Sequence, residues 1–392
     1  MVNKKLSIIV FLLLLLLNLP VQGQKYKCPT GKSFPIVAWY SIEENHISNE
    51  NYRVLEQAGF NISLSYYSTQ TNAKRALVAA EGTNVKLIVS CSDSLWRSGV
   101  AEKEIYKHPN FGLFYISDEP SIYDYPRIKR QIDSFKEYDK RHLPYVNLLP
   151  IYAKPAYLNG ITYLEYLQGY IDTFSPSYIS YDHYPFYRDV FKSDFFENLE
   201  IVSRLTQKYS IPFWGFVSSV TNSNNYMSNE AKIRFQVFCN IAYGAQGIQY
   251  FTYTCPKGNV SAILDSNYSK TSIYEIVAGV NDEIRQISKY VLNSKGHKVW
   301  HTGDIIPQGC TGIINDKRIE SIESDGIGLV CSLFKRKNKD YLLIVNRDYE
   351  HFQTADLKFS RKTKQITKEG FSKKSNAFVC SISPGDYRLF ML

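Results

Sequence analysis

Apart from one run near its start, the 392-residue chain has no long hydrophobic segment. The apolar run from Leu6 to Leu19 follows two lysines, is short for a membrane span, and precedes the small residue Gly23. This pattern predicts a secretory signal peptide over residues 1–24, with a retained membrane anchor as the alternative. We expect the mature chain to be secreted or periplasmic and to make no membrane contact once the signal is removed.

The cysteines show no spacing that would hold a metal ion or define a disulfide scaffold. There are seven, an odd number, and none has the Cys-x-x-Cys spacing of a metal or redox site. Cys91 and Cys239 lie in apolar segments, where a thiol is typical of a protein core. The histidines in predicted loops have no partner at ligand spacing. We therefore predict no metal ion and no other cofactor.

No basic cluster and no Gly-x-Ser-x-Gly elbow occurs in the sequence. The net charge of +9 is spread along the chain, so it allows an acidic polysaccharide as partner but gives no argument for nucleic acid. A serine hydrolase acting on an ester or amide therefore lacks support. Aromatic residues are abundant, with 31 Tyr and 22 Phe, which suits a sugar-binding cleft and equally a tyrosine-rich core.

Short apolar segments alternate with amphipathic ones over most of the chain. The predicted strands are 34–40, 61–67, 85–91, a segment starting at 111, 143–152, 178–184, 211–217 and 247–253. The predicted helices are 49–59, 72–81, 125–140, 163–174, 194–209, 229–243 and 272–292. Parallel strands need crossover helices, and eight such units close a barrel, so we predict an α/β fold with a (β/α)8 TIM barrel over residues 25–297.

A doubly wound open sheet is the competing arrangement for such an alternation. It would usually carry a glycine-rich phosphate turn after its first strand, and none follows Tyr40. From residue 298 onward the helical period disappears, and strand-like pieces at 327–334, 341–346 and 377–382 are separated by polar turns. We predict a small all-β antiparallel sandwich domain over residues 298–392.

The segment that starts at Phe111 carries the most informative pattern. Its apolar residues read as a strand buried on both faces, and the strand leads directly into Asp118 and Glu119 before Pro120 stops it. In this barrel fold, residues that follow the strands line the active site. Adjacent strand residues point to opposite sides, so both acids reach the site only if Pro120 or a β-bulge redirects one of them. The alternative is an ordinary solvated turn.

Cleavage of a glycosidic bond needs an acid and a second carboxylate. We predict Glu119 as the general acid, with Asp118 raising its pKa by like-charge repulsion. For the second carboxylate we favour Asp182 over Asp93, since its neighbours His183 and Tyr184 can donate hydrogen bonds and keep it ionised. A salt-bridged loop residue is the alternative for Asp182.

Aromatic residues near predicted strand ends are candidates for stacking against a sugar ring. Together with the two neighbours of Asp182, the predicted substrate-binding residues are Trp39, Tyr66, Trp96, His183, Tyr184, Trp214 and Tyr253. Packing inside the barrel mouth is the alternative for each ring.

Two motifs resemble a known enzyme clan. Ser117-Asp-Glu-Pro120 on the fourth strand resembles the Asn-Glu-Pro of clan A retaining glycoside hydrolases, whose Glu is the acid/base. Asp182-His-Tyr-Pro-Phe186 on the sixth strand is similar to the His-and-Tyr pattern that many of them carry. Bacterial secreted glycosidases of this type often end in a sandwich closed by a Pro-Gly-Asp-like turn, which this tail resembles. The resemblance implies a barrel enzyme that acts on carbohydrate.

The sequence departs from that clan at two places. Asp118 stands where the clan has Asn, and the nucleophilic Glu expected on the seventh strand is missing, with Phe216, Val217 and Ser218 near its position. Hexosaminidases that use the N-acetyl group of their substrate share only the Asp-Glu dipeptide, which leaves substrate-assisted cleavage as an alternative mechanism.

The sequence therefore predicts a secreted glycoside hydrolase that cleaves a poly- or oligosaccharide with a pair of carboxylates. The alternative from another class is a non-catalytic glycan-binding barrel, which the empty seventh strand favours. The oligomeric state does not follow from the sequence.

Overall fold

The computed structural model describes residues 26–187, 190–222, 228–257, 259–367 and 370–392. The predicted signal peptide, residues 1–24, lies outside the described residues and stays a prediction. Within the described residues, no helix is both long and apolar enough to cross a bilayer.

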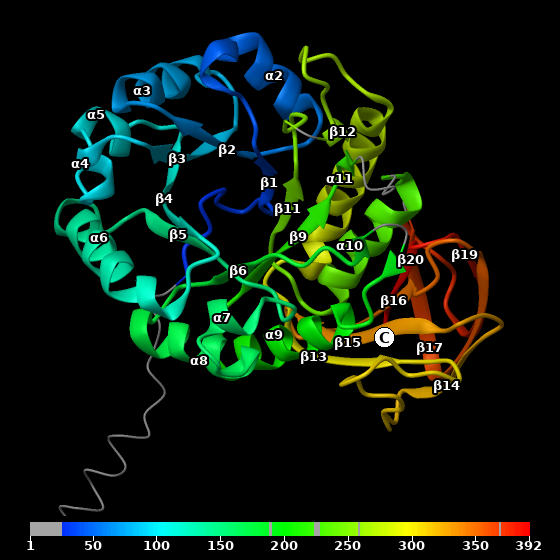
Figure 1. The fold of residues 1–392 in the computed structure, drawn as a ribbon. Helices are drawn as coiled ribbons and strands as arrows, with labels where there is room; N and C mark the ends of the chain where they lie inside the picture. The colour runs from blue at the N-terminus through cyan, green and yellow to red at the C-terminus, as the bar shows by residue number, and fades with distance from the viewer. Residues whose placement is uncertain (1–25, 188–189, 223–227, 258, 368–369) are drawn as a thin grey trace, which may run out of the picture.

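Eight parallel strands close into a barrel (Figure 1). They are β1 (Ile36–Trp39), β2 (Ile62–Tyr67), β3 (Lys86–Cys91), β4 (Phe111–Asp118), β5 (Leu143–Leu148), β6 (Ile179–Tyr181), β9 (Phe213–Ser218) and β11 (Ile248–Phe251). The ring closes because β1 pairs in parallel with both β2 and β11. The predicted TIM barrel is therefore confirmed. The fifth, sixth and eighth strands end earlier than predicted, so the loops above them are longer.

Helices cover the outside of the barrel (Figure 1). The long ones are α2 (Asn49–Gln57), α3 (Gln70–Ala79), α6 (Tyr125–Tyr138), α8 (Tyr163–Phe174), α9 (Phe195–Tyr209), α10 (Glu230–Ala242) and α11 (Ser272–Val291). The short ones are α4 (Ser94–Arg97), α5 (Lys103–Tyr106) and α7 (Pro155–Leu158). Side-chain caps set several starts: Thr162 and Glu165 form a capping box at α8, and Asn229 caps α10.

Small ribbons decorate the loops. β7 (Phe186–Tyr187) pairs with β8 (Val190–Phe191), and β10 (Thr221–Asn222) pairs with β12 (Asn259–Ser261). Single 3₁₀ turns, η1 (Glu44–His46) and η2 (Ile122–Asp124), follow β1 and β4.

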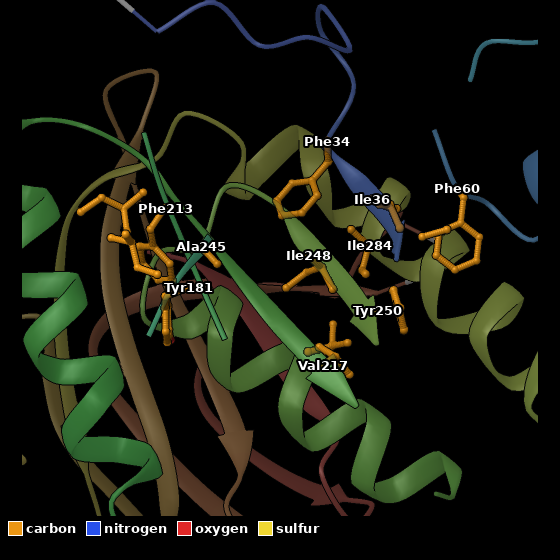
Figure 2. Close-up of a cluster of buried hydrophobic side chains, with 14 of the residues drawn as sticks. Phe34, Ile36, Phe60, Tyr181, Phe213, Val217, Ala245, Ile248, Tyr250 and Ile284 are labelled. Carbon is orange, nitrogen blue, oxygen red and sulfur yellow. The ribbon is translucent and has the colours of Figure 1, made fainter. Parts of the chain in front are cut away.

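One hydrophobic layer joins the strands to the surrounding helices (Figure 2). One buried cluster contains side chains from three strands and one helix: Ile36 of β1, Val217 of β9, Ile248 of β11 and Ile284 of α11. On each strand these residues alternate with residues that point into the barrel. Each of these side chains is fully buried, and full burial of an aliphatic side chain is worth about 1.5–3 kcal/mol. This packing fixes the strand ends that carry the polar groups described below.

A second layer fills the barrel interior. Its buried members are Val37, Trp39, Ile62, Leu64, Ile88, Leu113, Leu143, Tyr145, Tyr178, Trp214 and Phe216. Partly buried tyrosines and Phe251 pack against it. The cylinder is thus a packed core, and solvent reaches only its mouth.

Antiparallel strands form the C-terminal part. They are β13 (Lys295–His301), β14 (Ile319–Ser324), β15 (Leu329–Arg336), β16 (Lys339–Asn346), β17 (Gln353–Thr367), β18 (Gly370–Phe371), β19 (Ser375–Ile382) and β20 (Tyr387–Met391). The first half of β17 pairs with β14 and β19, and its second half pairs with β20. The all-β C-terminal part is confirmed. The predicted boundary between residues 297 and 298 falls within β13.

A buried ion-pair network ties this part to the barrel. Arg234 of α10 is 9% exposed and donates from Nη1 to Glu283 of α11, at 3.0 Å, and from Nη2 to Asp386, at 2.6 Å. Although burial alone would raise it, the Arg234 guanidinium holds the pKa of Asp386 below its usual range. Removing the C-terminal part would take away one of the acidic partners of the buried Arg234 guanidinium.

All seven cysteines lie among the described residues as free thiols. Cys91 and Cys239 are buried, as predicted. In the part of the chain that the structure describes, no group of three or more His, Cys, Asp or Glu side chains is placed to hold a metal ion.

Candidate active site

The C-terminal ends of three neighbouring strands bring acidic and amide side chains together. Asn147, near the end of β5, lies between Asp118 of β4 and Asp182, which directly follows β6. Its Nδ2 donates to Asp118 Oδ1 at 3.0 Å and to Asp182 Oδ1 at 3.1 Å. Because both oxygens bond one nitrogen, they are separated by no more than twice a hydrogen-bond length.

The end of β4 departs from regular strand geometry in two ways. Its register with β5 shifts between Tyr115 and Ser117, which marks a β-bulge or irregularity in the pairing. Glu119 then takes a φ of 43°, in the left-handed region, while its N–H donates to the Asn147 carbonyl at 2.8 Å. Such a conformation costs about 1–3 kcal/mol in a non-glycine residue. Tyr166 holds the following turn by donating from its hydroxyl to the Pro120 carbonyl at 2.8 Å.

This irregular geometry brings both acids to one mouth, as the sequence required. Asp118 and Glu119 are both exposed there, whereas Asp182 is 7% exposed and lies below them. The carboxyl of Glu119 is hydrogen-bonded to that of Asp182, and the carboxyl of Asp118 meets Asn147. Two carboxyl groups in such contact cannot both ionise easily, so the Glu119–Asp182 pair is suited to share one proton.

Burial and charge act together on the three carboxyls. Solvent reaches Glu119, but the protein atoms around it displace part of its hydration and raise its pKa; the charge of Asp118 adds to the rise, and the hydrogen bond with Asp182 opposes it. Burial raises the pKa of Asp182 well above its ordinary value, and the charges of Glu119 and Asp118 act in the same direction. Partial burial also raises the pKa of Asp118, against the hydrogen bond from Asn147. Raised carboxyl pKa values suit acid catalysis near neutral pH.

Hydrogen bonds inside the barrel orient the Asn147 side chain. Ser180 donates from Oγ to Asn147 Oδ1 at 2.9 Å, and Gln249 donates from Nε2 to Ser180 Oγ at 2.8 Å. Tyr145 donates from its hydroxyl to Gln249 Oε1 at 2.5 Å. The amide nitrogen of Asn147 is thereby directed at the carboxyls.

The neighbours of Asp182 do not act as predicted. His183 is buried and its Nε2 lies 2.9 Å from Asp194 Oδ1, so its carboxylate partner is Asp194 and not Asp182. Tyr184 is partly buried, with its ring centroid 5.3 Å from that of Phe251. The side-chain donor to Asp182 is Asn147, which the sequence reasoning missed.

Three predicted stacking residues are wrong. Trp96 is 2% exposed and lies outside the barrel, 5.1 Å from Phe135 of α6 between ring centroids. Trp214 is 0% exposed and lies in the N-terminal half of β9, where its Nε1 donates to the Tyr26 hydroxyl at 3.3 Å. Tyr253 is 1% exposed and belongs to the outer core. Each ring is packed on all sides, so none offers a face to a sugar.

The other two predicted rings lie at or beneath the mouth. Trp39 is buried inside the barrel, with its ring centroid 5.1 Å from that of Phe216, so it supports the mouth from below. Tyr66 is partly buried and donates from its hydroxyl to the Tyr115 hydroxyl at 3.1 Å.

A row of aromatic rings that includes two unpredicted residues lines the mouth. Tyr40 is 38% exposed, and its ring centroid lies 5.5 Å from that of Tyr66 and 6.0 Å from that of Phe251. Phe251 in turn contacts Tyr184. We call Tyr40, Tyr66, Tyr184 and Phe251 the aromatic row. Each of these rings lies within three residues of the C-terminal end of a strand, and this position was their signal in the sequence.

Other acids at the strand ends have structural partners. Asp93 accepts a hydrogen bond from the Trp96 N–H at 2.9 Å and so caps α4. Glu44 accepts from Asn72 Nδ2 at 3.1 Å. At the end of β9, Ser218 is 5% exposed, and no acid lies on that strand.

Solved structures of low sequence identity share this architecture. A GH42 β-galactosidase from G. stearothermophilus, solved as a catalytic mutant, matches with a TM-score of 0.63 at 8% identity, over 95% of this chain and 99% of that chain. A β-galactosidase from the psychrophilic Marinomonas ef1 matches with a TM-score of 0.50 at 9% identity, over 66% of this chain and 61% of that chain. At this identity the matches show the fold alone: the chain has a (β/α)8 barrel fold like that of these two glycosidases.

The likeness to these solved structures is recognisable in the fold and not in the sequence. No protein-family model matches the chain. The comparison with curated proteins found no match either. The predicted resemblance to clan A is confirmed at the level of the barrel and its C-terminal all-β part.

Proposed function

We propose that this protein is a glycoside hydrolase that cleaves a glycosidic bond in a poly- or oligosaccharide. The observation that carries the proposal is the cluster of Asp118, Glu119 and Asp182 at the mouth of a barrel whose structural neighbours are glycosidases. The aromatic row beside it supplies ring faces of the kind that pack against sugars. We further propose that the chain is exported, on the basis of residues 1–24.

In the proposed reaction, Glu119 gives its proton to the glycosidic oxygen as the bond to the anomeric carbon breaks. The carboxylate of Asp182 attacks the anomeric carbon and forms a glycosyl ester, which water then hydrolyses while Glu119 takes back a proton. Retaining pairs lie about 5–5.5 Å apart, and inverting pairs are about 6.5–9.5 Å apart to admit a water. Hydrogen-bonded carboxyls favour the shorter arrangement, so we propose retention of configuration.

A panel of aryl glycosides and polysaccharides tests this proposal. The mature protein should release product from at least one member, and proton NMR of the first product formed should show the anomer of the substrate. Release of the opposite anomer would contradict the role of Asp182 as nucleophile while leaving glycosidase activity in place. No release from any substrate would favour the second candidate below.

The second candidate is a glycan-binding barrel without catalysis. The end of β9 favours it, because Phe216, Val217 and Ser218 supply no carboxylate where clan A has its nucleophile. Retardation of the protein in gels that contain a polysaccharide, with no product released, would support this candidate.

A further inference from the structure

Asn147 makes contacts that a structural asparagine would not need. Its side chain is 2% exposed, and its Nδ2 has one hydrogen for each of two carboxyls, Asp118 and Asp182. The remaining carboxyl of the cluster, Glu119, receives no hydrogen bond from this amide; it meets Asn147 only through the main chain. The Asn147 side chain therefore donates hydrogen bonds to Asp118 and Asp182 but not to Glu119.

Hydrogen bonds deeper in the barrel determine that the amide nitrogen of Asn147, and not its oxygen, faces the carboxyls. A reversed amide would turn its oxygen toward two carboxylates and its nitrogen toward Ser180. Ser180 has a single hydroxyl hydrogen, and its Oγ already accepts from Gln249 Nε2 at 2.8 Å, so it serves as the donor to Asn147 Oδ1. Gln249 is fixed in the same sense, because its Oε1 accepts from the hydroxyl of Tyr145. We call Tyr145, Gln249, Ser180 and Asn147 the interior relay.

An N–H donor stabilises a carboxylate more than it stabilises the protonated acid. Asp182 is buried, so without such a donor its charged form would be costly. Two hydrogen bonds from one rigid amide also hold Asp118 and Asp182 at a set separation, and misplacement of reacting groups by about 1 Å can cost 10²-fold in rate.

We propose that Asn147 is a positioning residue that holds Asp118 and Asp182 at a set separation and stabilises their ionised forms, which favours the state with the proton of the cluster on Glu119. The inference rests on the proposed function and deepens it, because it assigns the acid and the nucleophile within that cluster. The other three residues of the interior relay act through Asn147 and do not touch the substrate.

Other titratable groups face the cluster from neighbouring loops and strands. They are the phenols of Tyr40, Tyr66, Tyr115, Tyr152 and Tyr184 and the ammonium of Lys192. Burial raises the pKa of each of these phenols, so they stay neutral near neutral pH. The ammonium of Lys192 lies over the ring of Tyr152, 3.4 Å from its centroid.

Two substitutions test the role of Asn147. Asn147→Leu removes the donor at similar volume, and Asn147→Asp replaces it with an acceptor of the same shape. The pKa values of Asp118 and Asp182 should then rise, so the nucleophile ionises only at higher pH. We expect kcat/KM to fall at least tenfold in Asn147→Leu, and the acidic limb of its pH profile to move up by about one unit, the equivalent of one charge-assisted hydrogen bond. Asn147→Asp should move that limb at least as far.

Asn110→Leu is the matched control. Asn110 is also buried, but it donates to the main-chain carbonyls of Ala80, at 3.1 Å, and Val85, at 2.8 Å, at the other end of β4. It should lose stability and keep the acidic limb of the wild type. If both Asn147 variants also keep that limb, Asn147 is only structural and the inference is wrong.

A readout without substrate separates this inference from the proposed function. Carboxyl ¹³C NMR of protein labelled in Asp and Glu should show higher titration midpoints for Asp118 and Asp182 in Asn147→Leu than in the wild type. If these midpoints shift while the wild type cleaves no glycoside, the hydrolase proposal fails and the positioning role stands. Unshifted midpoints in an active enzyme would overturn the positioning role alone. Ser180→Ala, which leaves Asn147 in place, should give a smaller shift of the same sign and serves if the Asn147 variants do not fold.

Discussion

Strands β4 and β9 end at the same rim of the barrel, but they differ there in backbone geometry and in the side chains they carry. β4 carries an irregular register, a left-handed residue at Glu119 and exposed acids. β9 runs straight to Ser218 with six buried residues. In the clan A pattern that the sequence resembles, both strands carry a catalytic Glu. Here the irregularity and the acids occur together on β4, and neither occurs on β9.

The contrast shows where backbone strain accompanies chemistry. Local strain persists only where the surroundings determine it, and it concentrates at functional sites. The pairing of β4 with β5 and the Tyr166 hydrogen bond hold the strained end of β4. The reacting groups are therefore expected on β4, β5 and β6, and the aromatic row runs from the ends of β1, β2 and β11 to Tyr184 in the loop after β6.

The largest expected effect is at Glu119. Glu119→Gln keeps the shape and removes the proton, so kcat should fall by about 10²–10⁴, the usual contribution of a general acid. Ser218→Ala on β9 should change kcat less than threefold by the same assay. An active Glu119→Gln variant, or a large loss of activity in Ser218→Ala, would contradict the assignment of the reacting groups to β4 and not to β9.

Asp182→Asn should have the next largest effect. It removes the proposed nucleophile and leaves an amide beside Asn147, so we expect kcat to fall by at least about 10². In Asp182→Ala, which opens space at this position, added azide should restore part of the turnover by attacking the anomeric carbon from the vacated side. Asp93→Asn, at the cap of α4, should keep near-normal activity, because Asn also caps helices well. Equal losses in the two variants would leave Asp182 without a special role.

Asp118→Asn should move the pH profile. Burial raises the pKa of Glu119 first, and the Asp118 charge adds to it, so removing that charge lowers the pKa. The acid then loses its proton at lower pH, and the basic limb should move down by about one unit. Asp133→Asn, which breaks an exposed pair with Lys129 at 3.0 Å on α6, should leave the limb in place. A basic limb that stays fixed in Asp118→Asn would show that burial alone sets the pKa of Glu119.

The smallest expected effect is at the aromatic row. Tyr40→Ala should raise KM about two- to tenfold and leave kcat unchanged, since a ring contact is worth about 0.5–1.5 kcal/mol. Phe371→Ala, an exposed ring on β18 of the C-terminal part, is the control and should change neither constant. A fall in kcat with unchanged KM would place Tyr40 among the reacting groups instead.

Periodicity carried most of the fold prediction, because each strand and helix has a strong local pattern. The start of β5 at Leu143 and the start of α8 at Tyr163 were both predicted correctly. The length of β5 was not, since it ends at Leu148 and the apolar residues beyond it belong to a loop. The predicted strand of residues 143–152 placed Asn147 near its middle, whereas Asn147 lies next to the last residue of β5.

Side-chain direction explains the remaining errors in the site. Tryptophans near strand ends were expected at the mouth, but Trp214 lies at the opposite end of its strand and Trp96 faces the helices. Nothing local distinguishes these orientations, because the closure of the barrel sets them. A search limited to carboxylates could not find Asn147, whose importance comes from two contacts far apart in sequence.

Arg234 makes it difficult to produce the barrel without the C-terminal part, because it bonds to both. Its guanidinium bonds Glu283 on a helix of the barrel and also Asp386, which lies 152 residues further along the chain and just before β20. A shortened version that stops before β13 would keep the Arg234–Glu283 pair and lose Asp386, so the buried guanidinium would have one acidic partner fewer. Anyone who wants the barrel by itself would do better to exchange Arg234 and Glu283 together for apolar side chains of similar volume.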